Sequence, residues 1–82
     1  MDYELTSHAR ERIEERLISK QLIGEALRNP TKVLYDEDGR ILIKKLYIKR
    51  GEERLLLIIG YKNDGKLRII TIIETSKVKK YL

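Results

Sequence analysis

Apolar residues in the first third of the chain recur at helical spacing. One stripe of positions four residues apart spans residues 8–17 and comprises Ala9, Ile13 and Leu17. Thr6 and Ser7 can cap its first turn. A second apolar face follows the cap residue Ser19 and ends at Asn29-Pro30, since proline disfavours a helix before it. The pattern predicts a hairpin of two helices.

From residue 31 onward, β-rich runs alternate with turn sequences. The expected strands span residues 31–35, 40–49, 54–61 and 66–75. Connections this short permit only antiparallel neighbours, so we expect a four-stranded meander with both helices across one face. Along the second expected strand, the apolar side chains change from one face of the strand to the other at Lys44-Lys45. This change predicts a bulge there. The tail, residues 76–82, is expected to be a fifth edge strand or a loose end.

The third and fourth expected strands are apolar on both faces, over residues 55–59 and 69–73. Two small helices can cover only one face of the sheet. We therefore expect a partner or a second copy of the chain against the other face.

Length and composition place the chain in one α+β domain over residues 1–82. Its 18 basic and 13 acidic residues give a net charge of +5, which favours a polyanionic partner. Because the sequence contains no cysteine, we expect neither a disulfide nor a thiolate metal site. With no signal-peptide pattern and no apolar run of about 20 residues, we expect a cytoplasmic protein without a membrane partner.

The single histidine begins a polar stripe on the first expected helix. His8, Arg12 and Arg16 follow one another at four-residue intervals, about 100° around the helix from the apolar stripe. An imidazole, two guanidiniums and the helix N-terminus could meet a phosphate together. The alternative is a solvated face, in which neighbouring glutamates neutralise the arginines.

The string His8-Ala9-x-x-Arg12-Ile13-x-x-Arg16-x-Ile18-Ser19 and a strand containing Thr71 resemble small domains grouped with RelE/ParE-like and BrnT-like toxins and their barnase-like ribonuclease relatives. The resemblance covers nearly the whole chain. It implies a RelE-like fold of two helices on an antiparallel sheet, pairing with an antitoxin and, in some branches, RNA cleavage. It carries over to His8, Arg12, Arg16 and Thr71.

On this basis we expect a toxin-like endoribonuclease that needs no metal or cofactor. His8 would be the general base or acid for attack by the substrate's own 2′-OH, and Arg12 and Arg16 would stabilise the phosphorane. A second proton-transfer group would come from Tyr61 and Lys62, or from Tyr81 and Lys79.

The expected RNA contacts are Arg12, Arg16, Lys62, Thr71, Lys77 and Lys79. The RNA could be free or on the ribosome. Two alternatives stay open: a non-catalytic module that binds nucleic acid or an antitoxin, and a homodimeric structural protein.

Overall fold

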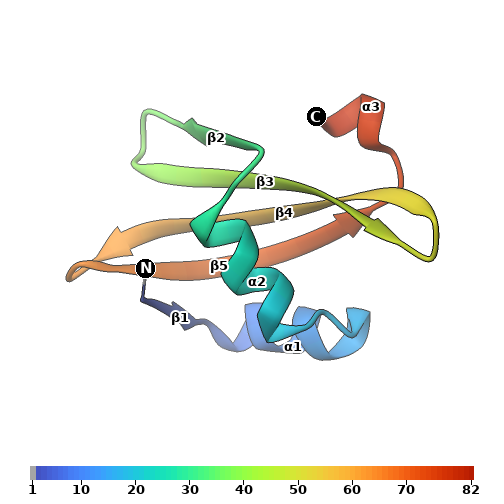
Figure 1. The fold of residues 1–82 in the computed structure, drawn as a ribbon. Helices are drawn as coiled ribbons and strands as arrows, with labels where there is room; N and C mark the ends of the chain where they lie inside the picture. Colours follow the sequence, from blue (N-terminus) through green and yellow to red (C-terminus); the bar gives the residue numbers. More distant parts are fainter. Residues whose placement is uncertain (1) are drawn as a thin grey trace.

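The computed structural model describes residues 2–82, which form three helices and one five-stranded sheet (Figure 1). In chain order the elements are β1 (Tyr3–Leu5), α1 (Ser7–Arg16), α2 (Lys20–Arg28), β2 (Lys32–Tyr35), β3 (Arg40–Lys49), β4 (Glu52–Asn63), β5 (Lys66–Thr75) and α3 (Val78–Tyr81). Within this part of the chain, no helix is both long enough and apolar enough to cross a membrane. The α+β class and the two N-terminal helices are confirmed.

The strands lie in the order β1-β5-β4-β3-β2. All neighbours from β2 to β5 are antiparallel, as expected of a meander. The expectation of a purely antiparallel sheet is wrong, because β1 runs parallel to β5 with Tyr3 opposite Leu67. A parallel pair needs a long connection, and here residues 6–65 supply it.

The fifth strand therefore comes from the beginning of the described chain and not from the tail. Val78–Tyr81 form a short helix, α3, so the prediction of an edge strand or loose end for residues 76–82 is wrong. β1 has only three residues, too few to show an alternating pattern in the sequence.

Thr6 fixes the start of α1 to the middle of β5. Its backbone N–H donates to the Ile69 carbonyl over 3.1 Å, and its hydroxyl donates to the Ile70 carbonyl over 3.0 Å. The same hydroxyl accepts from the Ala9 N–H over 3.1 Å, so Thr6, and not Ser7, is the N-cap. α1 then runs along the outer edge of β5, beyond the point where β1 ends.

Leu17 ends α1 in the left-handed conformation, with φ of 53°, and its side chain is 85% exposed. The Ile18 N–H donates to the Ile13 carbonyl and the Leu17 N–H to the Glu14 carbonyl, which is a Schellman motif. The apolar stripe predicted for this helix includes Leu17, and this part of the prediction is wrong, because the helix ends before Leu17 and leaves it outside the core. Ile18 takes the buried position instead.

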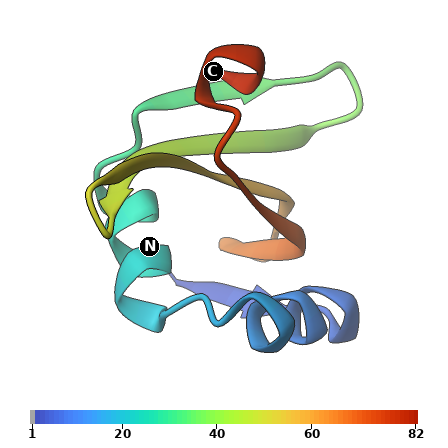
Figure 2. The same cartoon turned by 90° about the vertical axis from the view of Figure 1, so that its right-hand side faces the viewer.

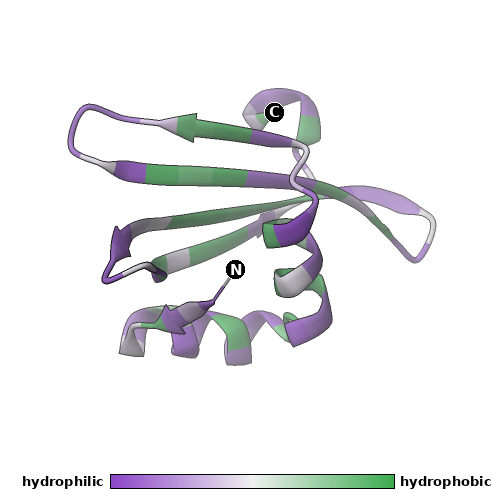
Figure 3. Ribbon diagram, turned by 60° about the vertical axis from the view of Figure 1, so that its left-hand side comes forward, coloured by the Kyte–Doolittle hydropathy of each residue, from purple (hydrophilic) through white to green (hydrophobic). Residues whose placement is uncertain are grey.

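The core lies between the helices and one side of the sheet, which we call the helix face. Its main members are Ala9, Ile18, Ile23, Ala26, Ile43, Leu56, Ile58, Ile69 and Ile72. Figure 3 shows the apolar colour concentrated along the central strands, with polar colour at the hairpin ends. In β4 the side chains that meet the helices are Leu56 and Ile58, while Leu55 and Leu57 point to the opposite face.

The irregularity of the sheet lies between β4 and β5. Ile59 is opposite Thr71 and Gly60 is opposite Ile69, so Ile70 is the extra residue of a β-bulge. β3 pairs with β4 without interruption, and the bulge predicted at Lys44-Lys45 is wrong.

Two buried lysines explain why the apolar positions of β3 change from one face of the strand to the other. Lys45 points to the helix face, where its ammonium donates to the Asn29 carbonyl at the end of α2 over 2.8 Å. Lys44 points to the opposite face, where its ammonium donates to the Tyr81 carbonyl at the end of α3. Carbonyls at a helix C-terminus lack partners within the helix, and each lysine supplies one. Figure 2 shows α1 and α2 on one side of the sheet and α3 on the other.

Candidate nucleic-acid interface

The sheet face opposite α1 and α2 is covered over only part of its length. α3 lies against β4, and Lys32 and Lys44 hold the Leu82 carbonyl over 3.2 and 3.3 Å. Under this cover Leu55 is fully buried and Leu57 is nearly so. The end of the sheet near the β4–β5 turn has no such cover among the described residues.

We call this uncovered part the open face. It comprises Leu34, Arg40, Leu42, Ile59, Tyr61, Arg68, Thr71 and Ile73. Three of its large side chains are 37–45% exposed: Tyr61, Leu34 and Ile73. The second face of the sheet is thus exposed in this area, and a partner or second copy against it stays a prediction.

The residues of the open face form two rows across the strands. In one row Tyr61 of β4 lies between Arg40 of β3 and Arg68 of β5. In the next row Leu34, Leu42, Ile59 and Thr71 lie side by side. Neighbouring strands are about 4.8 Å apart, so each row brings its side chains into mutual contact range.

A groove of about 410 Å³ lies beside these rows, at the β2–β3 end of the open face. Its lining includes Leu34, Leu42 and Ile59 together with Tyr35 and Arg40. Asp36 shapes one wall, because its carboxylate accepts from the backbone N–H groups of Asp38 and Arg40 and holds the turn.

The two arginines of the first row differ in their surroundings. Arg68 is 3.3 Å from the carboxylate of Glu4 in β1, and this pair is partly exposed. Arg40 is exposed, and its guanidinium forms no ion pair within residues 2–82. The Asp36 carboxylate lines the same groove, so an anion there would meet both charges.

α1 carries the predicted stripe on its side away from α2. Arg10, Ile13 and Glu14 of α1 line a groove shared with α2 and β1. His8 and Arg12 are each two residues from Arg10, which places them on the opposite side of the helix, about 160° away. His8 is exposed, and its side chain forms no hydrogen bond within residues 2–82.

The two arginines of the stripe also face solvent to different degrees. Arg12 is 40% exposed and approaches Glu15 only to 3.9 Å, while Arg16 is exposed at the end of α1. Over its 10 residues α1 rises about 15 Å, the length of about five strand residues. Since Thr6, the N-cap of α1, bonds to the Ile70 carbonyl, α1 packs against the part of β5 that contains Thr71.

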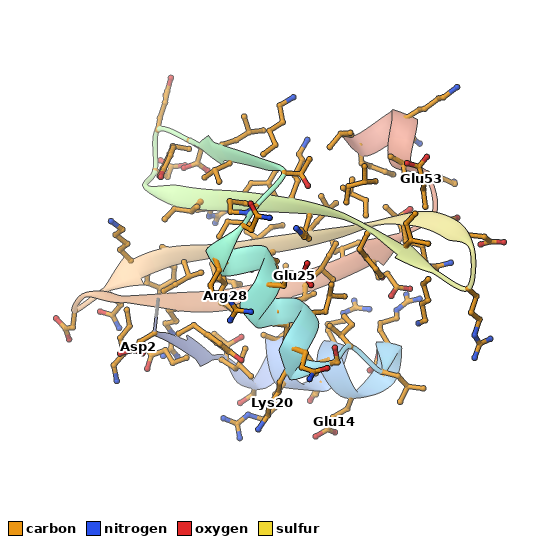
Figure 4. All side chains as sticks on the ribbon, in the orientation of Figure 1. Asp2, Glu14, Lys20, Glu25, Arg28 and Glu53 are labelled. Carbon is orange, nitrogen blue, oxygen red and sulfur yellow. The ribbon has the colours of Figure 1, made fainter. Side chains whose placement is uncertain are left out.

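The other expected RNA contacts are dispersed. Thr71 lies on the open face, opposite Ile59. Lys62 is exposed near the β4–β5 turn and pairs with Leu67, which places it on the helix-face side. Lys77 and Lys79 lie at α3, beside Glu53 (Figure 4). The structure thus places Thr71 on the strand against which α1 packs, and leaves the lysines elsewhere.

Charge is unevenly distributed between the helical and sheet parts of the chain. Residues 2–31 contain five basic and six acidic residues, whereas residues 32–82 contain thirteen basic and seven acidic ones. The whole positive excess therefore belongs to the sheet and the tail.

Sequence reasoning missed the row of Arg40, Tyr61 and Arg68, although a signal for it was present. Arg50-Gly51 and Asp64-Gly65 form two-residue turns with positive φ at both positions, as in type I′ hairpins. A hairpin turn of known length fixes which residues pair along the two strands. Counting outward from these turns would have placed Tyr61 opposite both arginines.

Sequence reasoning also missed a polar cluster at the other end of the helix face. Glu74 of β5 accepts a hydrogen bond from the Tyr47 hydroxyl and two from Arg54, over 2.8 and 3.1 Å. Lys49 approaches the same carboxylate to 3.8 Å. The Glu74 side chain is only 10% exposed, so the cluster ties the ends of β3, β4 and β5 together.

The pKa shifts in this cluster favour an ionised Glu74 and a protonated Tyr47. Burial by itself would raise the pKa of Glu74, but the hydrogen bonds from Tyr47 and Arg54 and the nearby cations outweigh it and lower the pKa. Burial and the hydrogen bond to Glu74 raise the pKa of Tyr47. Glu74 stays ionised and Tyr47 stays protonated near neutral pH, so the cluster holds the strands together and is not set to transfer a proton.

A family model described as a domain of unknown function (DUF4258) matches residues 5–74. The chain belongs to this family. The DUF4258 match contains α1, the open face and the cluster around Glu74, and it ends before α3. Lys77 and Lys79 therefore lie outside the matched segment. No curated protein and no solved structure matches the chain.

Proposed function

We propose that this domain binds RNA through the open face and the adjoining stripe of His8, Arg12 and Arg16. The observation that carries the proposal is the exposed Arg40 on an uncovered sheet face, in a chain with a net charge of +5. Phosphate contacts by lysine and arginine supply most of the affinity of such surfaces. Arg40 contributes a guanidinium without an ion partner in residues 2–82.

The resemblance to RelE/ParE-like and BrnT-like toxins favours RNA over other polyanions. It also adds an antitoxin as a second partner and assigns the fold to the RelE-like group. The antitoxin partner and the RelE-like fold are parts of this proposal, because a resemblance in fold does not by itself establish a function.

Fluorescence anisotropy with a labelled RNA oligonucleotide, repeated at several salt concentrations, tests binding. The paired substitution Arg12→Ala with Arg16→Ala should weaken binding and lower the slope of log affinity against log salt by about 0.7 for each lost contact to a single strand. A matched control removes Arg10 and Lys20, which line the groove between α1 and α2. Figure 4 shows Lys20 at that side of the molecule, away from α3.

The control pair should keep the parental affinity apart from a small loss of general attraction. Equal losses in both pairs would contradict a specific role for the stripe. Absence of RNA binding by the parent at low salt would refute the proposed function itself.

Cleavage of the bound RNA is the second candidate, and the position of His8 favours it. The imidazole is exposed in the first turn of α1, on the same side of the helix as Arg12. Acting as the base, it would take the proton of a 2′-OH as that oxygen attacks the adjacent phosphorus, and Arg12 and Arg16 would stabilise the phosphorane. The 5′-oxygen then leaves with a proton from solvent or from a second group.

A proton-transfer role for His8 contributes about 10²- to 10⁴-fold to the rate. His8→Ala should therefore remove most cleavage and leave RNA affinity within a few-fold. Cleavage should continue in EDTA and give 2′,3′-cyclic phosphate ends, and 2′-deoxyribose at the scissile position should block it. If His8→Ala cleaves as fast as the parent, or the parent does not cleave with or without ribosomes, binding alone stands.

A further inference from the structure

Tyr61 occupies a distinct position on the open face. It is the central residue of a row in which each neighbouring strand presents an arginine, Arg40 on β3 and Arg68 on β5. The tyrosine is 37% exposed, so its ring is supported by the sheet and accessible from outside. An aromatic ring between two guanidiniums offers a flat surface for stacking and charges for phosphate.

The groove of about 410 Å³ continues this surface toward β2. Its floor is apolar, through Leu34, Leu42 and Ile59, and Arg40 lies at its border with the row of Tyr61. A volume of this size lies within the range of about 300–1,000 Å³ for small-ligand sites. The apolar floor suits the flat face of a nucleobase, and Arg40 suits the phosphate between two nucleotides.

We propose that the open face binds a single-stranded segment of RNA, with one base stacked on Tyr61 and the next base in the groove beside Arg40. This inference rests on the proposed function and specifies its ligand. Bases of a duplex are stacked on one another and their faces are inaccessible, so only an unpaired strand can use an aromatic side chain in this way.

Charge argues against a second copy of the chain as the occupant. A two-fold symmetric contact through this row would bring Arg40 and Arg68 of both copies into one interface. Like charges in an interface are costly, and Glu4 is already paired with Arg68. A polyanionic strand meets the same two arginines with complementary charge.

The test uses the full chain and a fluorescein-labelled 12-nucleotide RNA, either single-stranded or annealed to its complement. The parent should bind the single strand at least tenfold more tightly than the duplex. Tyr61→Leu removes the ring but keeps an apolar side chain, and it should weaken single-strand binding about five- to hundredfold, as expected for the loss of one base stack. Tyr61→Phe keeps the ring and should bind within about twofold of the parent.

Arg40→Ala should weaken binding and reduce the salt slope by about 0.7, while Arg10→Ala on the α2 side should not. Unfolding curves of each variant establish that it is folded before binding is compared. Because Tyr61 is partly exposed, Tyr61→Leu should unfold within a few degrees of Tyr61→Phe.

Four results would overturn the inference. If the protein binds RNA but Tyr61→Leu behaves as the parent, or duplex and single strand bind equally, the proposed function stands and the stacking site is wrong. If the parent is a dimer by light scattering and Leu34→Arg makes it monomeric, the open face is an interface between copies. If no RNA binds at low salt, the proposed function fails first and the inference with it.

Discussion

Gly60→Ala tests the β-bulge and the close approach of β4 to β5. A Cβ at residue 60 would lie 2.4 Å from the Arg68 carbonyl oxygen, 3.1 Å from the Arg68 carbonyl carbon and 3.2 Å from the Ile69 Cα. All three atoms belong to the backbone of β5. No rotation of a side chain can relieve the contact, so the strands themselves must move apart by about 1 Å to restore an ordinary separation.

The expected cost follows from the place of this contact in the sheet. Overpacking a core typically costs about 1–3 kcal/mol, and here the movement also strains backbone hydrogen bonds between two central strands. We expect a loss of about 3 kcal/mol. A domain of this length has a free energy of unfolding of about 4–12 kcal/mol, so the loss is a large fraction of it. The melting temperature should fall by about 12–24 °C.

Gly24→Ala is the matched control. A Cβ at residue 24 meets only the Arg28 guanidinium, 3.1 Å away at the end of a flexible side chain. Residue 24 lies inside α2, where alanine is more favourable than glycine by about 0.5–1 kcal/mol. Thermal and urea unfolding followed by circular dichroism should therefore shift in opposite directions for the two variants. A Gly60→Ala protein that melts within 2 °C of the parent would refute the packing described for the bulge.

Three further predictions concern stability. Ile13→Asp places an unpaired charge against the core and should lower stability by about 3 kcal/mol or more, so an unchanged melting temperature would contradict the packing of α1. Lys45→Met keeps the apolar stem but leaves the Asn29 carbonyl without its donor, and urea unfolding should show a loss of about 1–3 kcal/mol, whereas an equally stable variant would argue against this bond. The pKa of Glu74 is lowered in the folded state, so its contribution is complete above its ordinary value of 4.5 and disappears as the pH falls through the folded value. Glu74→Gln should therefore destabilise the protein at pH 7 and progressively less as the pH falls below 4.5, and a difference that does not change with pH would contradict the assignment.

Features that depend on local sequence were predictable. The helix of residues 20–28 follows from the Ser19 cap, whose hydroxyl accepts from the Leu22 N–H, and from one apolar face. The strands of the meander follow from their β-rich runs and turn sequences. The stripe of His8, Arg12 and Arg16 also follows from periodicity alone, because α1 spans all three.

Features that depend on contacts between distant residues were not predictable in the same way. β1 exists because three residues pair with β5, and the pairing, not the local sequence, makes them a strand. The pattern of Lys44 and Lys45 suggested a bulge, since lysine counts as polar in any alternation. Their burial depends on the helix ends that their ammonium groups reach, and those ends are set by the tertiary fold.

The pairing of β1 with β5 has a consequence for the order of folding. Thr6 holds α1 to Ile70, 64 residues further along the chain. During synthesis the first helices therefore leave the ribosome long before the strand against which α1 packs. Until β5 is made, the apolar sides of α1 and α2 have only partial cover and are exposed to other chains and chaperones. Contacts this distant in sequence close slowly, so docking of the N-terminal segment is expected to be a late step in folding.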